Sequence, residues 1–313
     1  MLHLIQGLEP VRRMAVIVFA LLLLSSLTIL ILRWTNPQRD WRELSARVRS
    51  WWIMAVLFFA AVALTPRVSI AFFGFISFWA MKEYITLLKT RAADHGGLVW
   101  IFLSIPIQYY WVAADWYGMF IIFIPVYVFL FLPMRLVMAK DTTGFIASVS
   151  QMQWGLMAFV FGLSHLAFLR GLPARPGTQA SGPTLVLFLV FVTEMSDVLQ
   201  YVWGKTLGRH KVIPAVSPNK TWEGLVGGIL STMLLSLAIR FLTPFSIPET
   251  LLVSLIITVA GFCGGAVMSA VKRDFGVKDF GDVIPGHGGV LDRVDSLCYA
   301  APLFFHYVRY FHY

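Results

Sequence analysis

Apolar runs of 17 to 20 residues recur along the whole chain, and they restrict its fold more than any other feature. Hydrophobic residues make up 58% of the 313 residues and charged residues only 13%, with a mean hydropathy of +0.75, which excludes a soluble globular domain. Only helices and closed barrels satisfy every backbone polar group within a membrane, and these runs are too long for barrel strands. The sequence therefore predicts an all-α polytopic membrane protein.

We predict about ten transmembrane helices, with ends placed to within a few residues. The first is kept as an anchor, because it is too long for a signal-peptide core and no small-residue cleavage site follows it. The second and third flank residues 65–67 and have one bent segment as an alternative. The predicted spans are residues 14–32, 51–64, 68–88, 98–114, 119–138, 148–169, 184–204, 225–241, 251–271 and 294–310.

The distribution of Lys and Arg favours ten spans over nine. With ten spans and the N-terminus outside, 18 of the 25 Lys and Arg residues fall on one side, which predicts that this side is cytoplasmic. Merging the second and third spans weakens the split to 15 against 9 and leaves Arg67 in the membrane. Cytoplasmic loops beside anionic lipid also explain the pI of about 9.7, so no nucleic-acid partner is needed.

Charged residues concentrate near the end of the chain, where residues 269–296 hold nine of the 41 charged residues of the protein. A second polar segment precedes the eighth predicted span. We predict one membrane domain in which residues 1–180 form a scaffold and residues 181–313 form the catalytic region. Its cytoplasmic loops would be residues 205–224 and 272–293.

Two pairs of acidic residues are spaced by three positions, which places each pair on one helix face. Glu194 and Asp197 continue an apolar run, where each acid costs roughly 2.5–3.5 kcal/mol to insert. Either their helix ends early and they reach water, or they face an internal polar cavity. Asp292 and Asp295 begin the last span, where they are favourable at a helix N-terminus or act as ligands.

The turn at residues 285–289, Pro-Gly-His-Gly-Gly, lies between these acids and a group of basic residues. Glycines let the backbone approach a ligand closely and offer N–H groups to an anion. Carboxylates without paired Cys or His favour Mg²⁺, which binds one or two carboxylates plus substrate phosphates, while Lys and Arg neutralise the remaining phosphate charge. His287 in this turn is either structural or functional.

Residues 269–295 resemble the signature of the phosphatidate cytidylyltransferases, also called CDP-diacylglycerol synthases. Upstream, residues 208–228 look like a second segment of that family, and the resemblance covers roughly residues 184–310. The matching positions are Ser269, Lys272, Arg273, Lys278, Asp279, Pro285, His287, Gly288, Gly289, Asp292, Arg293 and Asp295 in the signature, and Ser217, Pro218, Lys220, Thr221 and Gly224 upstream.

The resemblance implies that CTP and phosphatidic acid give CDP-diacylglycerol and pyrophosphate at the surface of the lipid bilayer. It implies Mg²⁺ as cofactor, a second cation as an open alternative, and a homodimer. The implied metal ligands are Asp292, Asp279, Asp295 and Asp197. The implied catalytic residues are Asp292, Asp279, Lys278 and Arg293, and the implied substrate-binding residues are Lys272, Arg273, Ser217, Lys220, Thr221, His287, Gly288 and Gly289.

The chain departs from the family pattern around its seventh span. The family usually places Ser or Thr and then a small residue after the membrane-embedded Asp, whereas Val198 and Leu199 follow Asp197 here, and Glu194 is an added acid. These changes indicate a divergent paralogue, and the compact chain indicates a bacterial inner membrane. The alternatives are a CTP-dependent enzyme of isoprenoid lipids, such as a CDP-synthase or a polyprenol kinase, an inactive paralogue, or a transporter.

Overall fold

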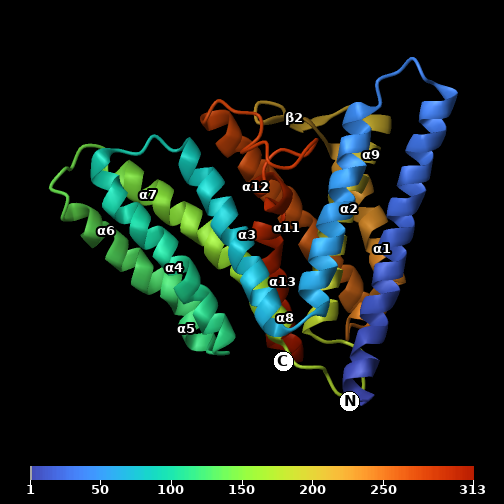
Figure 1. Ribbon diagram of the computed structural model, residues 1–313, viewed down its shortest axis with the longest axis horizontal. Coiled ribbons are helices and arrows are strands. Elements are labelled where there is room, and N and C mark those ends of the chain that lie inside the picture. Colours follow the sequence, from blue (N-terminus) through green and yellow to red (C-terminus); the bar gives the residue numbers. More distant parts are fainter. Residues whose placement is uncertain (1) are drawn as a thin grey trace.

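The protein is described here from a computed structural model, which covers residues 2–313, with side chains described from residue 9 onward. The chain is almost entirely helical, which confirms the predicted all-α membrane fold (Figure 1). The elements are α1 (Leu2–Thr35), α2 (Arg42–Ala63), α3 (Pro66–Leu87), η1 (Ala92–Asp94), α4 (His95–Ala113), α5 (Tyr117–Ile122), η2 (Phe123–Val128), α6 (Phe129–Val137), α7 (Phe145–Gly155), η3 (Leu156–Gly162), α8 (Leu163–Gly171), α9 (Gly182–Thr206), β1 (Lys211–Ile213), β2 (Ser217–Thr221), α10 (Trp222–Ala238), η4 (Arg240–Leu242), α11 (Ile247–Asp274), α12 (Leu291–Val294) and α13 (Leu297–His312).

Each predicted span coincides with a helix or with a run of continuous helical segments. Among the described residues, eight helical segments are long and apolar enough to cross a membrane. The other two predicted spans correspond to α10 and α13, which have 17 and 16 residues. Two spans contain a π-helical stretch, η2 and η3, and η2 includes Pro125, whose missing N–H disturbs the regular helical bonding.

The second and third spans are two helices, as the charge distribution predicts. Helix α2 ends at Ala63, and α3 starts at Pro66, which occupies the first helical position. Proline suits that position because its fixed φ matches the helix and its missing N–H has no partner there in any case. A bent single helix is therefore excluded.

The hairpin of β1 and β2 lies with α12 at one end of the molecule, while both chain termini lie at the other end (Figure 1). The two strands pair antiparallel, with Lys211 opposite Thr221 and Ile213 opposite Ser217. Which side of the membrane this end faces stays a prediction. The C-terminal loops that carry the predicted site do share this end.

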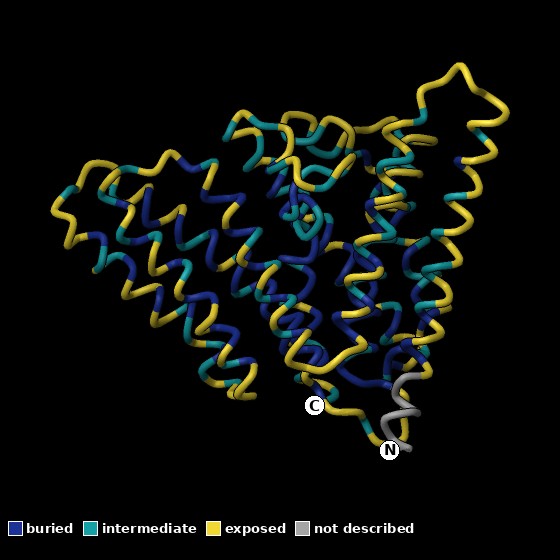
Figure 2. The backbone as a smooth tube through the Cα atoms, in the orientation of Figure 1, coloured by how far each residue is buried: buried dark blue, intermediate teal, exposed yellow. Residues whose placement is uncertain are grey.

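Burial is concentrated in the helices at the centre of the molecule (Figure 2). In the most apolar stretch of the segment Phe145–Gly171, 72% of the residues are buried inside the protein, against 6% in α1. Helix α1 contacts mainly α2. The segment Phe145–Gly171 thus lies in the core of the fold, and α1 lies at its edge with most of its apolar surface free for lipid.

Helices α9 and α10 approach each other closely through glycines on α10. A Cβ at Gly228 would lie 2.3 Å from Cγ of Gln200, and one at Gly224 would lie 2.8 Å from the Gln200 carbonyl oxygen. Small residues allow helix backbones to come this close within a membrane. This packing holds the hairpin, which leads directly into α10, beside the polar end of α9.

Candidate active site

Asp292 is the most firmly held carboxylate of the signature. Its side chain is 2% exposed, and Oδ2 accepts hydrogen bonds from the backbone N–H groups of Phe280 (2.8 Å) and Gly289 (3.0 Å). Oδ1 forms an ion pair with Nζ of Lys272 at 2.9 Å. The structure therefore joins a predicted metal ligand to a predicted phosphate ligand, and Asp292 closes the loop between α11 and α12.

The glycine turn folds over this carboxylate. Gly288 has a φ of +80°, and a Cβ at this position would lie 2.8 Å from Oδ2 of Asp292 and 3.2 Å from Cβ of Asp279. Both the left-handed conformation and the close approach require glycine here. Asp279 and Lys278 are exposed on the outer side of the same loop, where they are accessible to a ligand.

A second group of carboxylates lies where α9 meets the start of α13. The Ser296 hydroxyl donates a hydrogen bond to Oδ2 of Asp197 at 2.9 Å and lies 3.4 Å from Oδ1 of Asp295. Among the described residues, neither these two acids nor Glu194 forms a salt bridge. Asp197 therefore shares the Ser296 hydroxyl with a second acid, and direct ion pairs neutralise none of the three acids among the described residues.

Lys220 is the lysine of the hairpin that faces these acids. Its Nζ donates a hydrogen bond to the carbonyl oxygen of Phe262 at 3.2 Å and lies 4.4 Å from the centre of that ring. Burial lowers the pKa of Lys220, and the charges of Asp197 and Asp295 oppose that effect. The ammonium group is thus partly desolvated and close enough to these carboxylates to interact with their charges.

Two buried polar atoms near the glycine turn have no hydrogen-bond partner among the described residues: Nε of Arg293 and Nδ1 of His287. Partial burial lowers the pKa of His287, and the positive charges of Arg293 and Arg47 lower it further. The His287 ring packs against the edge of Trp51, with centroids 5.9 Å apart. Because buried N–H groups are rarely left unpaired, these atoms indicate a place for a hydrogen-bonding ligand.

The remaining predicted residues belong to the hairpin and to the end of α11. Thr221 is buried, and its hydroxyl accepts a hydrogen bond from the N–H of Gly224 at 3.1 Å, so it caps α10. Ser217 is partly buried in β2. Arg273 is exposed, and its Nε lies 3.5 Å from the carbonyl oxygen of Val216, so it links α11 to the hairpin.

The N-terminal half supplies contacts that the sequence analysis missed. Glu83 of α3 accepts hydrogen bonds from the N–H groups of Val290 and Leu291, and the Ser50 hydroxyl of α2 donates to the carbonyl oxygen of Pro285 at 2.9 Å. Glu83 lies within an apolar run, so the same cost of membrane insertion that singled out Glu194 also pointed to it. Ser50 carried no comparable signal.

The carboxylate oxygens in this region are the type of ligand that Mg²⁺ prefers. In the part of the chain that the structure describes, no three His, Cys, Asp or Glu side chains gather into a complete metal shell. Mg²⁺ does not need one, since it usually takes one or two carboxylates and completes its shell with water and substrate phosphates. Asp197 and Asp295, bridged by Ser296 and free of ion pairs, meet that requirement. Asp292 meets it less well, because Lys272 and two N–H groups already occupy its oxygens.

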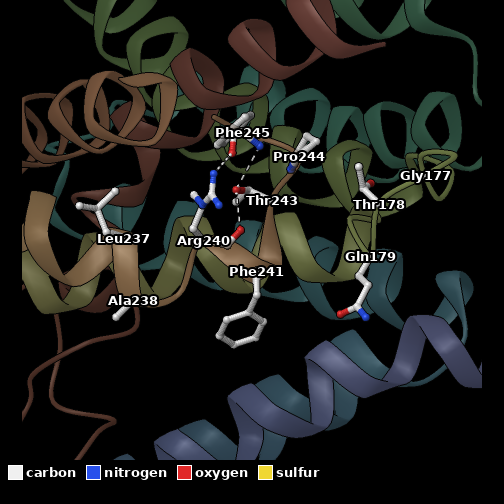
Figure 3. A pocket seen from close by; sticks show the side chains of 10 residues that line it. All are labelled: Gly177, Thr178, Gln179, Leu237, Ala238, Arg240, Phe241, Thr243, Pro244 and Phe245. Carbon is white, nitrogen blue, oxygen red and sulfur yellow. Dashed lines mark hydrogen bonds between the residues drawn. The ribbon is translucent and has the colours of Figure 1, made fainter. Parts of the chain in front are cut away.

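A cavity of about 530 Å³ lies away from these residues, where α10 ends and η4 begins (Figure 3). Arg240 is the one charged residue among those that line it, and its guanidinium donates to the carbonyl oxygen of Phe245 at 3.3 Å. No carboxylate lines it. This cavity is therefore separate from the polar cluster around the signature.

Comparisons with known proteins agree on one family. The sequence pattern of the cytidylyltransferase family matches residues 45–311. A protein of Escherichia coli K12 named "Uncharacterized protein YnbB" is 44% identical over 293 residues, which cover 93% of this chain and 96% of that protein. Proteins of Staphylococcus epidermidis and Staphylococcus haemolyticus, both named phosphatidate cytidylyltransferase, are 30% and 29% identical over 255 residues, which cover 80% of this chain and 94% of each relative.

Proposed function

The chain belongs to the cytidylyltransferase family, and from this membership we propose that it transfers the cytidylyl group of CTP to phosphatidic acid. As a member it is a nucleotidyltransferase of the membrane, which excludes the transporter alternative. In the proposed reaction, a phosphate oxygen of the lipid attacks the α-phosphorus of CTP. The bond from that phosphorus to the bridging oxygen breaks, and pyrophosphate leaves.

One observation supports the proposal: carboxylates suited to a metal ion and cationic side chains suited to phosphates lie together where the membrane helices meet the loops. Asp197 and Asp295 share the Ser296 hydroxyl, and Lys220 faces them from the hairpin. Arg293 leaves a buried Nε unpaired beside the glycine turn. A lipid phosphate that enters from the bilayer and a nucleotide that enters from the water phase would meet here.

Each residue has a physical task in this proposal. The lipid phosphate is already a competent nucleophile, so the protein has to position two anions and neutralise their charge. Arg293, Arg273, Lys278 and Lys272 would hold the CTP phosphates and the departing pyrophosphate, and Lys220 and Ser217 would hold the lipid phosphate. Thr221 and Asp292 would act by holding the hairpin and the turn in place.

We propose Mg²⁺ as the cofactor, held by Asp197 and Asp295 with Asp279 and Asp292 nearby, and a second cation stays an alternative. Mg²⁺ bound there would supply positive charge to the phosphate oxygens. Because CTP is cytosolic, the polar end would face the cytoplasm. The bacterial relatives support a bacterial cell membrane, and the homodimer implied by the family resemblance stays a proposal.

The first test is the transfer of labelled CTP onto phosphatidic acid by the detergent-purified protein, with Mg²⁺ and with EDTA. We expect CDP-diacylglycerol only with Mg²⁺, and a loss of at least about 100-fold in two variants. Asp295→Asn removes an electrostatic contribution of several kcal/mol, and Asp292→Asn releases the turn and misplaces the reacting groups. A Glu249→Gln variant, changed at the opposite end of α11, is the control and should keep wild-type activity.

The lipid that accepts the group transferred from CTP distinguishes the proposed enzyme from its alternatives. Glu194 is an added acid next to Asp197, so the assay includes an isoprenoid monophosphate and a free isoprenoid alcohol beside phosphatidic acid. Product from phosphatidic acid alone would support the proposal. Product from the isoprenoid monophosphate or the alcohol alone would replace it with an isoprenoid CDP-synthase or a CTP-dependent kinase, and no product from a folded protein would indicate an inactive paralogue.

A further inference from the structure

A buried carboxylate from the N-terminal half of the chain holds the signature turn, although it lies outside the signature. Glu83 of α3 is 5% exposed and forms no salt bridge with any residue that the structure describes. Its Oε1 accepts from the Val290 N–H and from Nε1 of Trp79, both at 3.0 Å, and its Oε2 accepts from the Leu291 N–H at 2.8 Å. Two of its three partners are therefore backbone groups directly after the turn.

The turn is shaped to receive this side chain. A Cβ at Gly289 would lie 2.4 Å from Oε2 of Glu83, and a Cβ at Gly281 would lie 3.0 Å from Oε1. Both glycines thus leave space that the carboxylate occupies. The fit involves two parts of the loop, Gly281 before the turn and Gly289 at its end.

Glu83 and Asp292 hold three consecutive N–H groups of one segment. Asp292 accepts from Gly289, and Glu83 accepts from Val290 and Leu291. These N–H groups precede or begin the short helix α12 and have no partner inside it. The position of Asp292, Arg293 and Asp295 therefore depends on both carboxylates.

We infer that Glu83 is a positioning residue for the cytidylyl transfer proposed above: it fixes the segment that carries Asp292, Arg293 and Asp295. This inference rests on the proposed function for its effect on activity, but not for its effect on the turn. All three partners of the Glu83 carboxylate are N–H donors, so both of its oxygens must act as acceptors. An amide in its place would direct an NH₂ group at one of those donors and leave it unpaired.

The test compares Glu83→Gln with Glu83→Asp in the full-length protein in detergent. We expect Glu83→Gln to lower kcat by about 10- to 100-fold, more than it raises KM for CTP, because a small misplacement of reacting groups costs this much. Glu83→Asp keeps both carboxylate oxygens on a shorter side chain and should recover part of the loss. A role limited to stability would lower the melting temperature and leave kcat of the folded protein unchanged in both variants.

A second readout does not depend on activity. Hydrogen exchange of the peptide covering residues 280–296 should speed up in Glu83→Gln at Val290 and Leu291, and less in Glu83→Asp. Glu249→Gln is the matched control, because Glu249 also accepts a backbone N–H, that of Ser246 at 2.8 Å, but at the other end of α11. It should change neither kcat nor exchange in this peptide.

The outcomes separate this inference from the proposed function. Wild-type exchange and kcat in Glu83→Gln would overturn the inference, and so would equal losses of kcat in the Gln and Asp variants. If Glu83→Gln does not fold, Glu83→Asp decides alone: faster exchange in residues 280–296 with lower kcat supports the inference, and no change overturns it. If the wild-type protein forms no CDP-lipid, the proposed function fails, and exchange still decides whether Glu83 holds the turn.

Discussion

At the scale of single residues, Gly289 shows how little freedom the signature turn has. It lies between two carboxylates: its N–H binds Asp292, and its Cα faces Glu83 so closely that no side chain fits. The need for glycine here comes from a tertiary contact. At Gly288, by contrast, the positive φ alone already favours glycine.

We predict that Gly289→Ala disrupts the turn. Its Cβ would lie 2.4 Å from Oε2 of Glu83, and overpacking of this kind typically costs about 1–3 kcal/mol. The variant should unfold at a lower temperature and lose at least about 10-fold in activity, because the displaced carboxylate releases the segment that carries Asp292. Gly171→Ala, where nothing lies within 4 Å of the added Cβ, is the control. Equal melting temperatures in the two variants would contradict the described packing.

The environment of His287 predicts that the stability of the protein depends on pH. Its folded-state pKa lies below the usual value because of partial burial and the nearby Arg293 and Arg47. Between that lowered pKa and about 6.5, the unfolded chain binds more protons than the folded one, so stability falls as the pH falls through this window.

The expected result is a melting temperature that drops between pH 7.5 and 5.5 in the wild type and drops less in His287→Gln. Thermal unfolding in detergent at both pH values measures the difference between the two proteins. A variant that loses as much stability as the wild type would show that other groups cause the whole effect.

At the scale of elements, the junction of β2 and α10 joins a loop of the candidate site to a membrane helix. Thr221 ends the strand and caps the helix, and the N–H of Trp222 binds the carbonyl oxygen of His210 at 2.9 Å. Glu223 accepts the N–H of Arg209 at 3.0 Å. The hairpin is thus fastened to the start of α10, which keeps β2 and its Lys220 beside α9 and α11.

We predict that Thr221→Ala destabilises the protein by about 1 kcal/mol, the usual value of a lost N-cap. Thr221→Ser keeps the hydroxyl that accepts the Gly224 N–H and should retain most of the stability. Apparent melting temperatures of both variants in detergent provide the measurement. If alanine and serine are equivalent at this position, the cap does not stabilise α10.

At the scale of the whole molecule, the alternation of basic loops predicts which end faces the cytoplasm. The hairpin and the loop between α11 and α12 lie at the predicted cytoplasmic end, and the loop around Gln179 lies at the other. By the positive-inside rule, the basic residues of these loops would set the orientation.

Cysteine labelling in intact and permeabilised cells tests that orientation. In a Cys263→Ser background, which leaves only the buried Cys298, we expect Gln179→Cys to react from outside. Asp282→Cys should react only after permeabilisation, because its loop would face the cytoplasm. The opposite pattern would invert the topology and separate the candidate site from cytosolic CTP.

The sequence alone determined the helical membrane fold, the positions of its helices and the segments that carry the polar residues. Hydropathy and charge are local properties, and a membrane converts them directly into helix positions and loop sides. The same cost argument singled out Glu194 and Asp197, and the spacing of residues 269–295 identified the family that the comparisons show.

Only the tertiary structure decided which of these residues touch. It paired Lys272 with Asp292, joined Asp197 to Asp295 through Ser296, and brought Glu83 to Val290, 207 residues further along the chain. No pattern in one sequence specifies such contacts, because they depend on how helices pack and on which buried N–H groups remain without a partner after secondary structure forms. Glu83 looked like one more acid in an apolar run until the fold placed it beneath the turn.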